Sequence, residues 1–355
     1  MKYTDIETDI ITADSFTEIN YGQKRLLLAA DSDVNGDGQK CADRLIKIVG
    51  AGVYNKIREK FRDKSYRDKV LENYAKRQIV CVTIKSADYP EGLAHVPYAP
   101  HVLYLRGNRE LLKTRMFAVV GARKSTVQAI EECKRTCSAL TEHFTVVTGV
   151  ADGADSAAVK GSLASGRIIC VLPGGHDTGC SPNMQLVKKV ESAGLTVSEF
   201  PPATRAQSFT FTMRNRIIAA LADGVLVVSA GIKSGALSTA NYANDYSKDV
   251  FAVPYSPGIP SGVGCNDLIK KGAYLCDSVD DIFGVMGVEC GAREEVGLDG
   301  SEKLIYDALK AEGELHAEKI ALSVKMPLTE VLTTCSLLEI KGLIIRTGGN
   351  SFSII

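Results

Sequence analysis

Short apolar runs alternate with segments of helical length over the middle of the chain. The pattern predicts strands at residues 79–84, 101–105, 116–120, 145–147, 167–172, 224–228 and 249–253, and helices at 126–141, 154–164 and 236–246. Strands that alternate with helices of about 10–15 residues indicate βαβ units and a parallel sheet. Because such crossovers are right-handed, we expect an α/β fold with a doubly wound, mostly parallel sheet.

The two flanks have a different pattern. Residues 1–78 read as helical and carry no strand pattern, and residues 286–300 form a polar, glycine-rich linker. Beyond the linker the pattern predicts helices at 303–312, 316–323 and 328–341, then a hairpin with strands at 343–347 and 351–355, which is typical of a winged helix. We therefore expect four parts: 1–78, 79–285, 286–300 and 301–355.

Composition narrows the class of protein. The chain has 355 residues, of which 45% are hydrophobic and 24% charged, as in ordinary globular proteins. No apolar run approaches the roughly 18 residues of a membrane helix, and the acidic start lacks a leader pattern, so we expect a cytoplasmic protein. The ten cysteines form no CxxC pair, which favours reduced, buried thiols over a metal site. An Asp-rich loop at 31–38 lacks the closing carboxylate of a calcium site and is interpreted as a turn.

Glycine-rich loops follow four of the predicted strands. They are Gly-Ala-Arg-Lys-Ser-Thr at 121–126, Thr-Gly-Val-Ala-Asp-Gly at 148–153, Pro-Gly-Gly at 173–175 and Lys-Ser-Gly-Ala-Leu at 233–237. Because ligands of an open parallel sheet bind above the carboxyl ends of its strands, backbone N–H groups of these loops are expected to form one anion-binding ledge. None of the loops matches GxGxxG or GxxxxGK[ST], so a dinucleotide cofactor and a P-loop are excluded and no cofactor is expected.

The charge pattern suggests which anion the ledge binds. Formal net charge is zero, so a nucleic-acid site would need local positive charge. Arg123, Lys124 and Lys233 lie on the loops, and residues 209–216 combine two phenylalanines with two arginines. Cations that contact phosphates, next to rings on which unstacked bases lie, are typical of single-strand binding.

The same segments resemble the DprA/Smf family of DNA-processing proteins. The matching motifs keep their order and spacing: Tyr-Pro at 89–90, Leu-Tyr-Leu-Arg-Gly-Asn at 103–108, Val-Gly-Ala-Arg at 120–123, Thr-Gly-Val-Ala-Asp-Gly-Ala-Asp at 148–155, Val-Leu-Pro-Gly-Gly at 171–175, Ser-Glu-Phe-Pro-Pro at 198–202, Arg-Asn-Arg-Ile-Ile-Ala-Ala-Leu at 214–221, Lys-Ser-Gly-Ala-Leu at 233–237, and Gly-Cys-Asn-Asp-Leu-Ile-Lys-Lys-Gly-Ala at 264–273. The resemblance spans residues 85–285.

This resemblance implies a Rossmann-like domain that binds single-stranded DNA, protects the incoming strand and loads the recombinase RecA onto it during natural transformation. It also implies a homodimer. The sequence contains no complete set of catalytic residues, so no enzymatic activity is expected. The residues that it places in the strand-binding site, together with the loop glycines, are Gly121, Arg123, Lys124, Gly149, Gly153, Gly174, Gly175, Phe211, Arg214, Asn215, Arg216, Lys233, Ser234 and Gly235. In this scheme Phe211 is the stacking ring and Arg123 contacts phosphate.

The chain departs from the family pattern at a few positions. Ala122 stands where Ser or Thr is usual, Thr212 where Pro is usual, and Cys180-Ser181 replaces a Tyr-Pro pair. The loop before Phe211 often has an extra cation near Gln207, which is uncharged here. These departures concern base stacking and affinity, because they leave the strand and helix pattern unchanged.

Two other functions are compatible with a Rossmann-like sheet. A LOG-like nucleoside-monophosphate phosphoribohydrolase would use PGGxGTxxE, but here Pro-Gly-Gly continues as His-Asp-Thr-Gly-Cys-Ser, and only Glu199 lies near a strand end. A nucleotide-sensing protein would use the same crevice. Residues 299–355 contain six Lys/Arg and eight Asp/Glu, a net charge of −2, which favours a protein-contact or regulatory role over duplex DNA binding.

Overall fold

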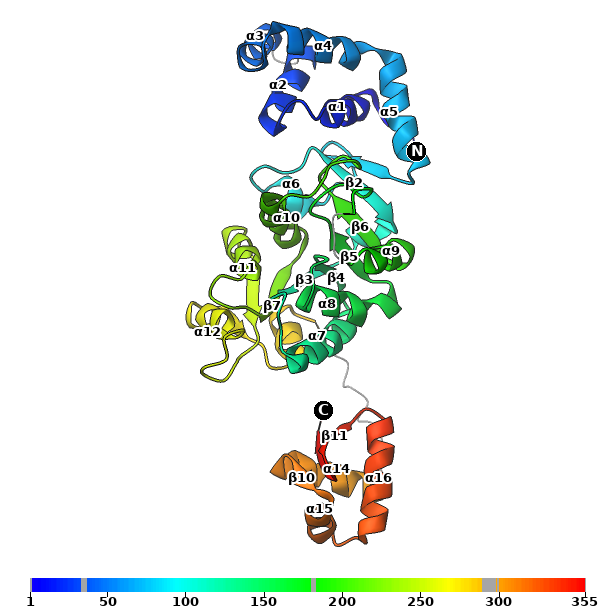
Figure 1. The fold of residues 1–355 in the computed structure, drawn as a ribbon, viewed down its shortest axis with the longest axis vertical. Helices are drawn as coiled ribbons and strands as arrows, with labels where there is room; N and C mark the ends of the chain where they lie inside the picture. The colour runs from blue at the N-terminus through cyan, green and yellow to red at the C-terminus, as the bar shows by residue number, and fades with distance from the viewer. Residues whose placement is uncertain (1, 33–36, 180–182, 289–297, 299, 355) are drawn as a thin grey trace. The chain divides into compact units, whose positions relative to one another are not determined.

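The computed structural model describes the whole chain except residues 1, 33–36, 180–182, 289–297, 299 and 355 (Figure 1). The chain divides into two compact units, Met1–Val288 and Glu289–Ile355. Parts of the expected Asp-rich loop and most of the expected linker at 286–300 lie outside the described residues. Each unit is described separately below.

The first unit begins with helices, as the sequence predicts. Thr4 and Glu7 form a reciprocal capping box at the start of the first helix, and the side chain of Asp63 accepts a hydrogen bond from Ser65 N at the start of the fifth. Phe16, Leu27 and Phe61 are buried in the core of this region. The helices are α1 (Asp5–Ser15), α2 (Tyr21–Ser32), α3 (Gly38–Val49), α4 (Ala51–Arg62) and α5 (Lys64–Lys76).

A nine-stranded sheet follows, in the order β1-β2-β6-β5-β4-β3-β7-β8-β9. The strands β1, β2 and β6 pair antiparallel, and every neighbour from β6 to β9 pairs parallel. This confirms the α/β, Rossmann-like, mostly parallel prediction. The strands are β1 (Val80–Thr83), β2 (Val102–Gly107), β3 (Met116–Gly121), β4 (Thr145–Thr148), β5 (Ile168–Val171), β6 (Leu195–Ser198), β7 (Gly224–Ser229), β8 (Asp249–Ala252) and β9 (Tyr274–Leu275).

Helices cover both faces of the sheet, which explains why the strands are apolar without alternation. Ala118 and Val120 of β3 belong to one core cluster, with residues of α10, α11 and α12, whereas Phe117 and Val119 belong to the other, with residues of α7, α8, α9 and α13. The helices are α6 (Glu91–Ala94), α7 (Val127–Leu140), α8 (Ala154–Ser162), α9 (Met184–Ala193), α10 (Ser208–Leu221), α11 (Ala236–Asp245), α12 (Val263–Lys270) and α13 (Val279–Val285), with short 3-10 turns η1 (Arg109–Lys113) and η2 (Leu163–Ser165).

The second unit contains the three helices and the hairpin that the sequence predicts, plus a short strand that it does not. The elements are α14 (Gly300–Glu312), β10 (Leu315–His316), α15 (Ala317–Val324), α16 (Leu328–Ile340), β11 (Ile344–Gly348) and β12 (Ser351–Ile354). The three strands form an antiparallel sheet in the order β10-β12-β11. Ile305, Val331 and Phe352 are buried in its own core. The assignment as a winged helix stays a prediction.

Among the described helices, none alone has the length and apolar composition of a membrane span. The helices α15 and α16 have that length and composition only when they are counted as one segment, and the chain bends by 108° between them.

Candidate functional site

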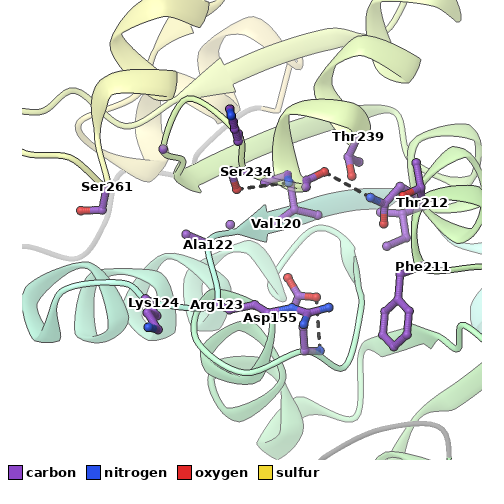
Figure 2. A pocket seen from close by; sticks show the side chains of 18 of the residues that line it. Val120, Ala122, Arg123, Lys124, Asp155, Phe211, Thr212, Ser234, Thr239 and Ser261 are labelled. Atoms are coloured by element: carbon purple, nitrogen blue, oxygen red, sulfur yellow. Dashed lines mark hydrogen bonds between the residues drawn. The ribbon is translucent and has the colours of Figure 1, made fainter. Parts of the chain in front are cut away.

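A pocket of about 720 Å³ opens at the carboxyl ends of β3 and β7 (Figure 2). The strand β3 pairs with β4 on one side and β7 on the other, so the chain changes direction across the sheet at this point. Such a switch point is where open α/β sheets bind ligands. The lining comes from the loops after β3, β4 and β7, from α10, from the first residues of α8 and α11, and from residues 260–261.

The first loop is fastened to the end of β7. Ala122 N donates hydrogen bonds to Ser229 O at 2.8 Å and to Ser229 Oγ at 3.2 Å, and the hydroxyls of Ser125 and Ser229 are 2.6 Å apart. Thr126 Oγ1 then accepts from Ala129 N at 3.2 Å and caps α7. These bonds fix the backbone of the loop, so that the exposed side chains of Arg123 and Lys124 remain at the pocket.

An arginine and an aromatic ring meet across the pocket. The guanidinium of Arg123 lies 5.3 Å from the ring centroid of Phe211, a cation–π contact. Phe211 is half-buried and lines the pocket, whereas Phe209, two residues earlier on α10, is 55% exposed and outside the lining. The helical turn explains the difference, since residues two apart face opposite sides of a helix.

Buried charges form part of the pocket lining. Arg214 is 5% exposed and donates a hydrogen bond from Nη1 to Val171 O at 2.9 Å. Burial raises the pKa of Asp155, while the Arg214 guanidinium and a hydrogen bond from Ala151 N act in the opposite direction. Both side chains converge on Gly149, where a Cβ would lie 2.0 Å from Arg214 Nη1. Glycine at this position therefore leaves room for the pair.

The last loop is held by the neighbouring helix α10. Asn215 Nδ2 donates hydrogen bonds to Gly235 O at 3.2 Å and to Ser238 Oγ at 2.8 Å. Ser234 Oγ accepts from Ala236 N at 3.3 Å, at the start of α11. The side chain of Lys233 is exposed on this loop and lines the pocket. Cations of the first and last loops therefore meet in one pocket.

The sequence pattern described as DNA recombination-mediator protein A matches residues 80–287, more than half of the chain. The chain belongs to this family. It is 36% identical over 245 residues to the DNA processing protein DprA of Bacillus subtilis, covering 67% of this chain and 80% of that protein. It is also 36% identical over 247 residues to the protein Smf of Synechocystis, covering 66% of this chain and 62% of that protein. The DprA/Smf resemblance of the sequence is confirmed.

Two solved DprA structures are similar to this chain. DNA processing protein A of Streptococcus pneumoniae aligns with a TM-score of 0.64 and 28% identity, over 80% of this chain and 98% of that one. The Helicobacter pylori protein, whose structure is described as showing a single-stranded DNA binding mode, aligns with a TM-score of 0.54 and 25% identity, over 59% of this chain and 95% of that one. Both structural similarities agree with the Rossmann-like fold described above for residues of the first unit.

The structure brings most of the predicted DprA site residues together. Those that line the pocket are Gly121, Arg123, Lys124, Phe211, Arg214, Asn215, Lys233, Ser234 and Gly235. Ser125 and Ser229, which brace the first loop, and Ser261, which lines the pocket, were not among the predicted residues. Ser229 ends an apolar strand and Ser261 lies far along the chain, so no local pattern marks either one.

Five predicted residues do not line the pocket. Gly153, with φ +78°, packs against the carbonyl of Ala122, and Gly174 and Gly175 pack under the backbone of residues 201–206. Gly149 lies behind Arg214, as described above. Arg216 forms a buried ion pair with Glu199, because it faces the opposite side of α10 from Arg214. These five residues therefore pack around the site and support its loops and helix, and they do not face the pocket.

The departures from the DprA pattern are placed as follows. Ala122 contributes its backbone N–H to the brace with Ser229, and Thr212 is exposed at the pocket. Gln207 forms a capping box with Thr210 at the start of α10. Cys180 and Ser181 lie outside the described residues. In the part of the chain that the structure describes, no cluster of three His, Cys, Asp or Glu side chains could hold a metal ion.

Proposed function

We propose that this chain binds single-stranded DNA in the pocket above β3 and β7. The observation that carries the proposal is the exposed Arg123 lying over the Phe211 ring, in a pocket that also contains Lys124 and Lys233. Phosphates would contact the three cations and the loop N–H groups, and a base would lie on Phe211. A groove of cations with a ring for stacking suits a strand of any sequence.

In our proposal, side chains of helix α10 hold the loops of this site in place, and the loop glycines allow the close packing that this requires. Arg214 and Asn215 hold the neighbouring loops, while Arg216 fixes the helix itself. The similar Helicobacter pylori structure, described as a single-stranded DNA binding mode, supports this reading. The chain as a whole has no net charge, so binding depends on these few local cations.

Charge reversal at Arg123 tests the site. Fluorescence polarisation with labelled oligo(dT) should show that Arg123→Glu weakens binding by about tenfold or more, because one charge-assisted contact of at least about 1.5 kcal/mol is lost. Wild-type affinity should fall steeply with salt as counterions are released. Lys134→Glu on α7, where Lys134 pairs with Glu131 outside the pocket, is the matched control and should bind normally. Normal binding by Arg123→Glu would refute the assignment.

We further propose that the chain protects incoming single strands and loads RecA onto them during natural transformation, in the cytoplasm. The family description as a recombination mediator supports this role. In a test with RecA on a strand already covered by single-strand-binding protein, the chain should shorten the lag before ATP hydrolysis. Arg123→Glu should not shorten it. An unchanged lag with the wild-type chain would contradict the loading role.

A homodimer is proposed on the free edge of the sheet. β9 ends the strand order, and its residues Tyr274 and Leu275 are 45% and 47% exposed. Beside it, Ile232 and Val263 are also exposed and line an apolar cleft. An exposed strand edge with apolar side chains is a template for pairing. Light scattering should show a dimer that Leu275→Glu converts to a monomer, and a wild-type monomer would contradict the proposal.

The non-enzymatic role is favoured over nucleotide hydrolysis by the position of Glu199. This carboxylate is buried and pairs with Arg216. Among the described residues, those that line the pocket do not include Glu199, so it is not positioned to act on a ligand there. Incubation with nucleoside monophosphates should release no free base above background. Mononucleotides should also fail to displace oligo(dT), whereas displacement would favour a nucleotide sensor. We also propose that the chain is organised in four parts, 1–78, 79–285, 286–300 and 301–355.

A further inference from the structure

The edge of the sheet that carries the pocket continues past β5 to β6 and β2. Because β2 runs antiparallel to β6, with Tyr104 opposite Ser198, β2 begins at the edge where β6 ends. The segment that leads into β2 therefore lies on the same edge as the pocket. Four inter-strand steps of about 4.8 Å separate β3 from β2, or roughly 19 Å.

An exposed tyrosine in strained backbone stands on this segment. Tyr98 has φ +58° and is 74% exposed. A left-handed conformation costs an ordinary L residue about 1–2 kcal/mol, and such strained residues cluster at functional sites. Burial does not explain why Tyr98 is held there, since most of the side chain faces solvent.

A second ring, from the N-terminal helices, fixes this arrangement. Tyr21 at the start of α2 contacts Tyr98 edge-to-face at 6.1 Å and stacks on His101 at 4.2 Å with an interplanar angle of 15°. Its hydroxyl donates a hydrogen bond to Ala99 O at 3.0 Å. Figure 1 shows the N-terminal helices next to the end of the sheet that contains β2. The rings are therefore positioned before any ligand arrives.

A cation accompanies the rings. Arg25 lies one turn after Tyr21 on α2 and is exposed. Burial raises the pKa of Tyr21, and the guanidiniums of Arg25 and Arg216 oppose that rise, which places both charges near the phenol. The nearby carboxylate of Glu199 pairs with Arg216. Arg25 thus leaves positive charge near Tyr21, the ring that contacts Tyr98.

We infer that Tyr98, Tyr21 and Arg25, the Tyr98 platform, bind a further base and phosphate of the same single strand that enters the pocket. This inference rests on the proposed function. An exposed ring, a supporting ring and a cation repeat the chemistry of Phe211 and Arg123, on the same edge of the sheet. Tyr21 and Arg25 lie outside residues 80–287, so the N-terminal helices supply part of the platform.

The test compares short and long oligo(dT) by fluorescence polarisation with the full chain. A strand of about 4 nucleotides should reach only the pocket, whereas one of about 16 should reach both sites. Tyr98→Asn removes the ring and suits the left-handed backbone, so it should weaken long-strand binding by about fivefold or more, the effect of losing one stacked base. It should leave short-strand binding unchanged. Tyr98→Phe keeps the ring and should bind both strands normally.

Direct contact is tested with 5-iododeoxyuridine placed along the long strand. Ultraviolet light should crosslink the chain at Tyr98 in the wild type and lose that crosslink in Tyr98→Asn. Equal affinity of wild type and Tyr98→Asn for the long strand would overturn the platform while leaving the pocket intact. A change in self-association with no change in long-strand binding would also overturn it, in favour of a protein contact. A wild-type chain that binds neither strand would instead refute the proposed function.

Discussion

At the scale of single residues, Gly153 shows how closely the first two loops pack. Its φ is +78°, and a Cβ there would lie 2.3 Å from the carbonyl oxygen of Ala122. Gly153→Ala should therefore lower the free energy of unfolding by about 1–3 kcal/mol from overpacking, in addition to about 1–2 kcal/mol for the left-handed backbone. Gly258 has φ +88° with nothing within 4 Å, so Gly258→Ala should show only the backbone cost. Equal losses in urea unfolding would contradict the crowding at Gly153.

A buried histidine makes stability depend on pH. Burial first, and then the nearby Arg106 guanidinium, lower the pKa of His176 to about 4. Between about pH 6.5 and pH 4 the unfolded chain takes up a proton that the folded chain does not, so stability falls as pH falls, by up to about 3 kcal/mol. His176→Gln cannot titrate and should show a shallower loss over this range in urea unfolding. Parallel curves for the two proteins would rule out His176 as the cause.

At the scale of elements, the ion pair of Arg216 with Glu199 ties α10 to the end of β6. Both side chains are nearly buried, 8% and 9% exposed. Glu199→Gln should therefore lower the free energy of unfolding by about 3–5 kcal/mol, because a buried cation loses its partner. The double variant Glu199→Gln with Arg216→Met should recover much of that loss in urea unfolding. If Arg216 contacted DNA directly, Arg216→Met would reduce the salt dependence of strand binding, and its buried position predicts no such reduction.

The elements also show what the sequence can and cannot predict. Apolar runs of strand length, each followed by a glycine loop, predict β3, β4, β5 and β7 because buried parallel strands need no polar face. The strands β6, β9 and β10 are not among the predicted strands. β6 has only four residues, and the two residues each of β9 and β10 carry no periodicity. The grouping of Arg123 with Lys233 follows from strand order at the switch point. The burial of Arg216 depends instead on the face of α10 that turns toward Glu199, and the left-handed backbone of Tyr98 depends on tertiary packing, so neither leaves a local pattern.

At the scale of the whole molecule, the two units have separate cores, and only the first contains the proposed strand site. Helix α16, the third helix of the second unit, contains Glu330 and Glu339 but no Lys or Arg. Its exposed side chains include Leu337 and Ile340, at 47% and 82%. A helix that enters duplex DNA is expected to carry cations for phosphate, so this composition favours contact with protein.

This composition gives the last prediction. A chain ending at residue 288 should bind oligo(dT) with the same affinity and the same salt dependence as the full chain, because each proposed phosphate contact lies in the first unit. In gel shifts with duplex DNA, the full chain should bind no more tightly than the shortened one. Introducing cations into the full chain by Leu337→Lys and Ile340→Lys provides the positive control, since duplex affinity should then rise. Duplex binding that disappears on removal of residues 289–355 would show instead that the second unit holds DNA despite its net negative charge.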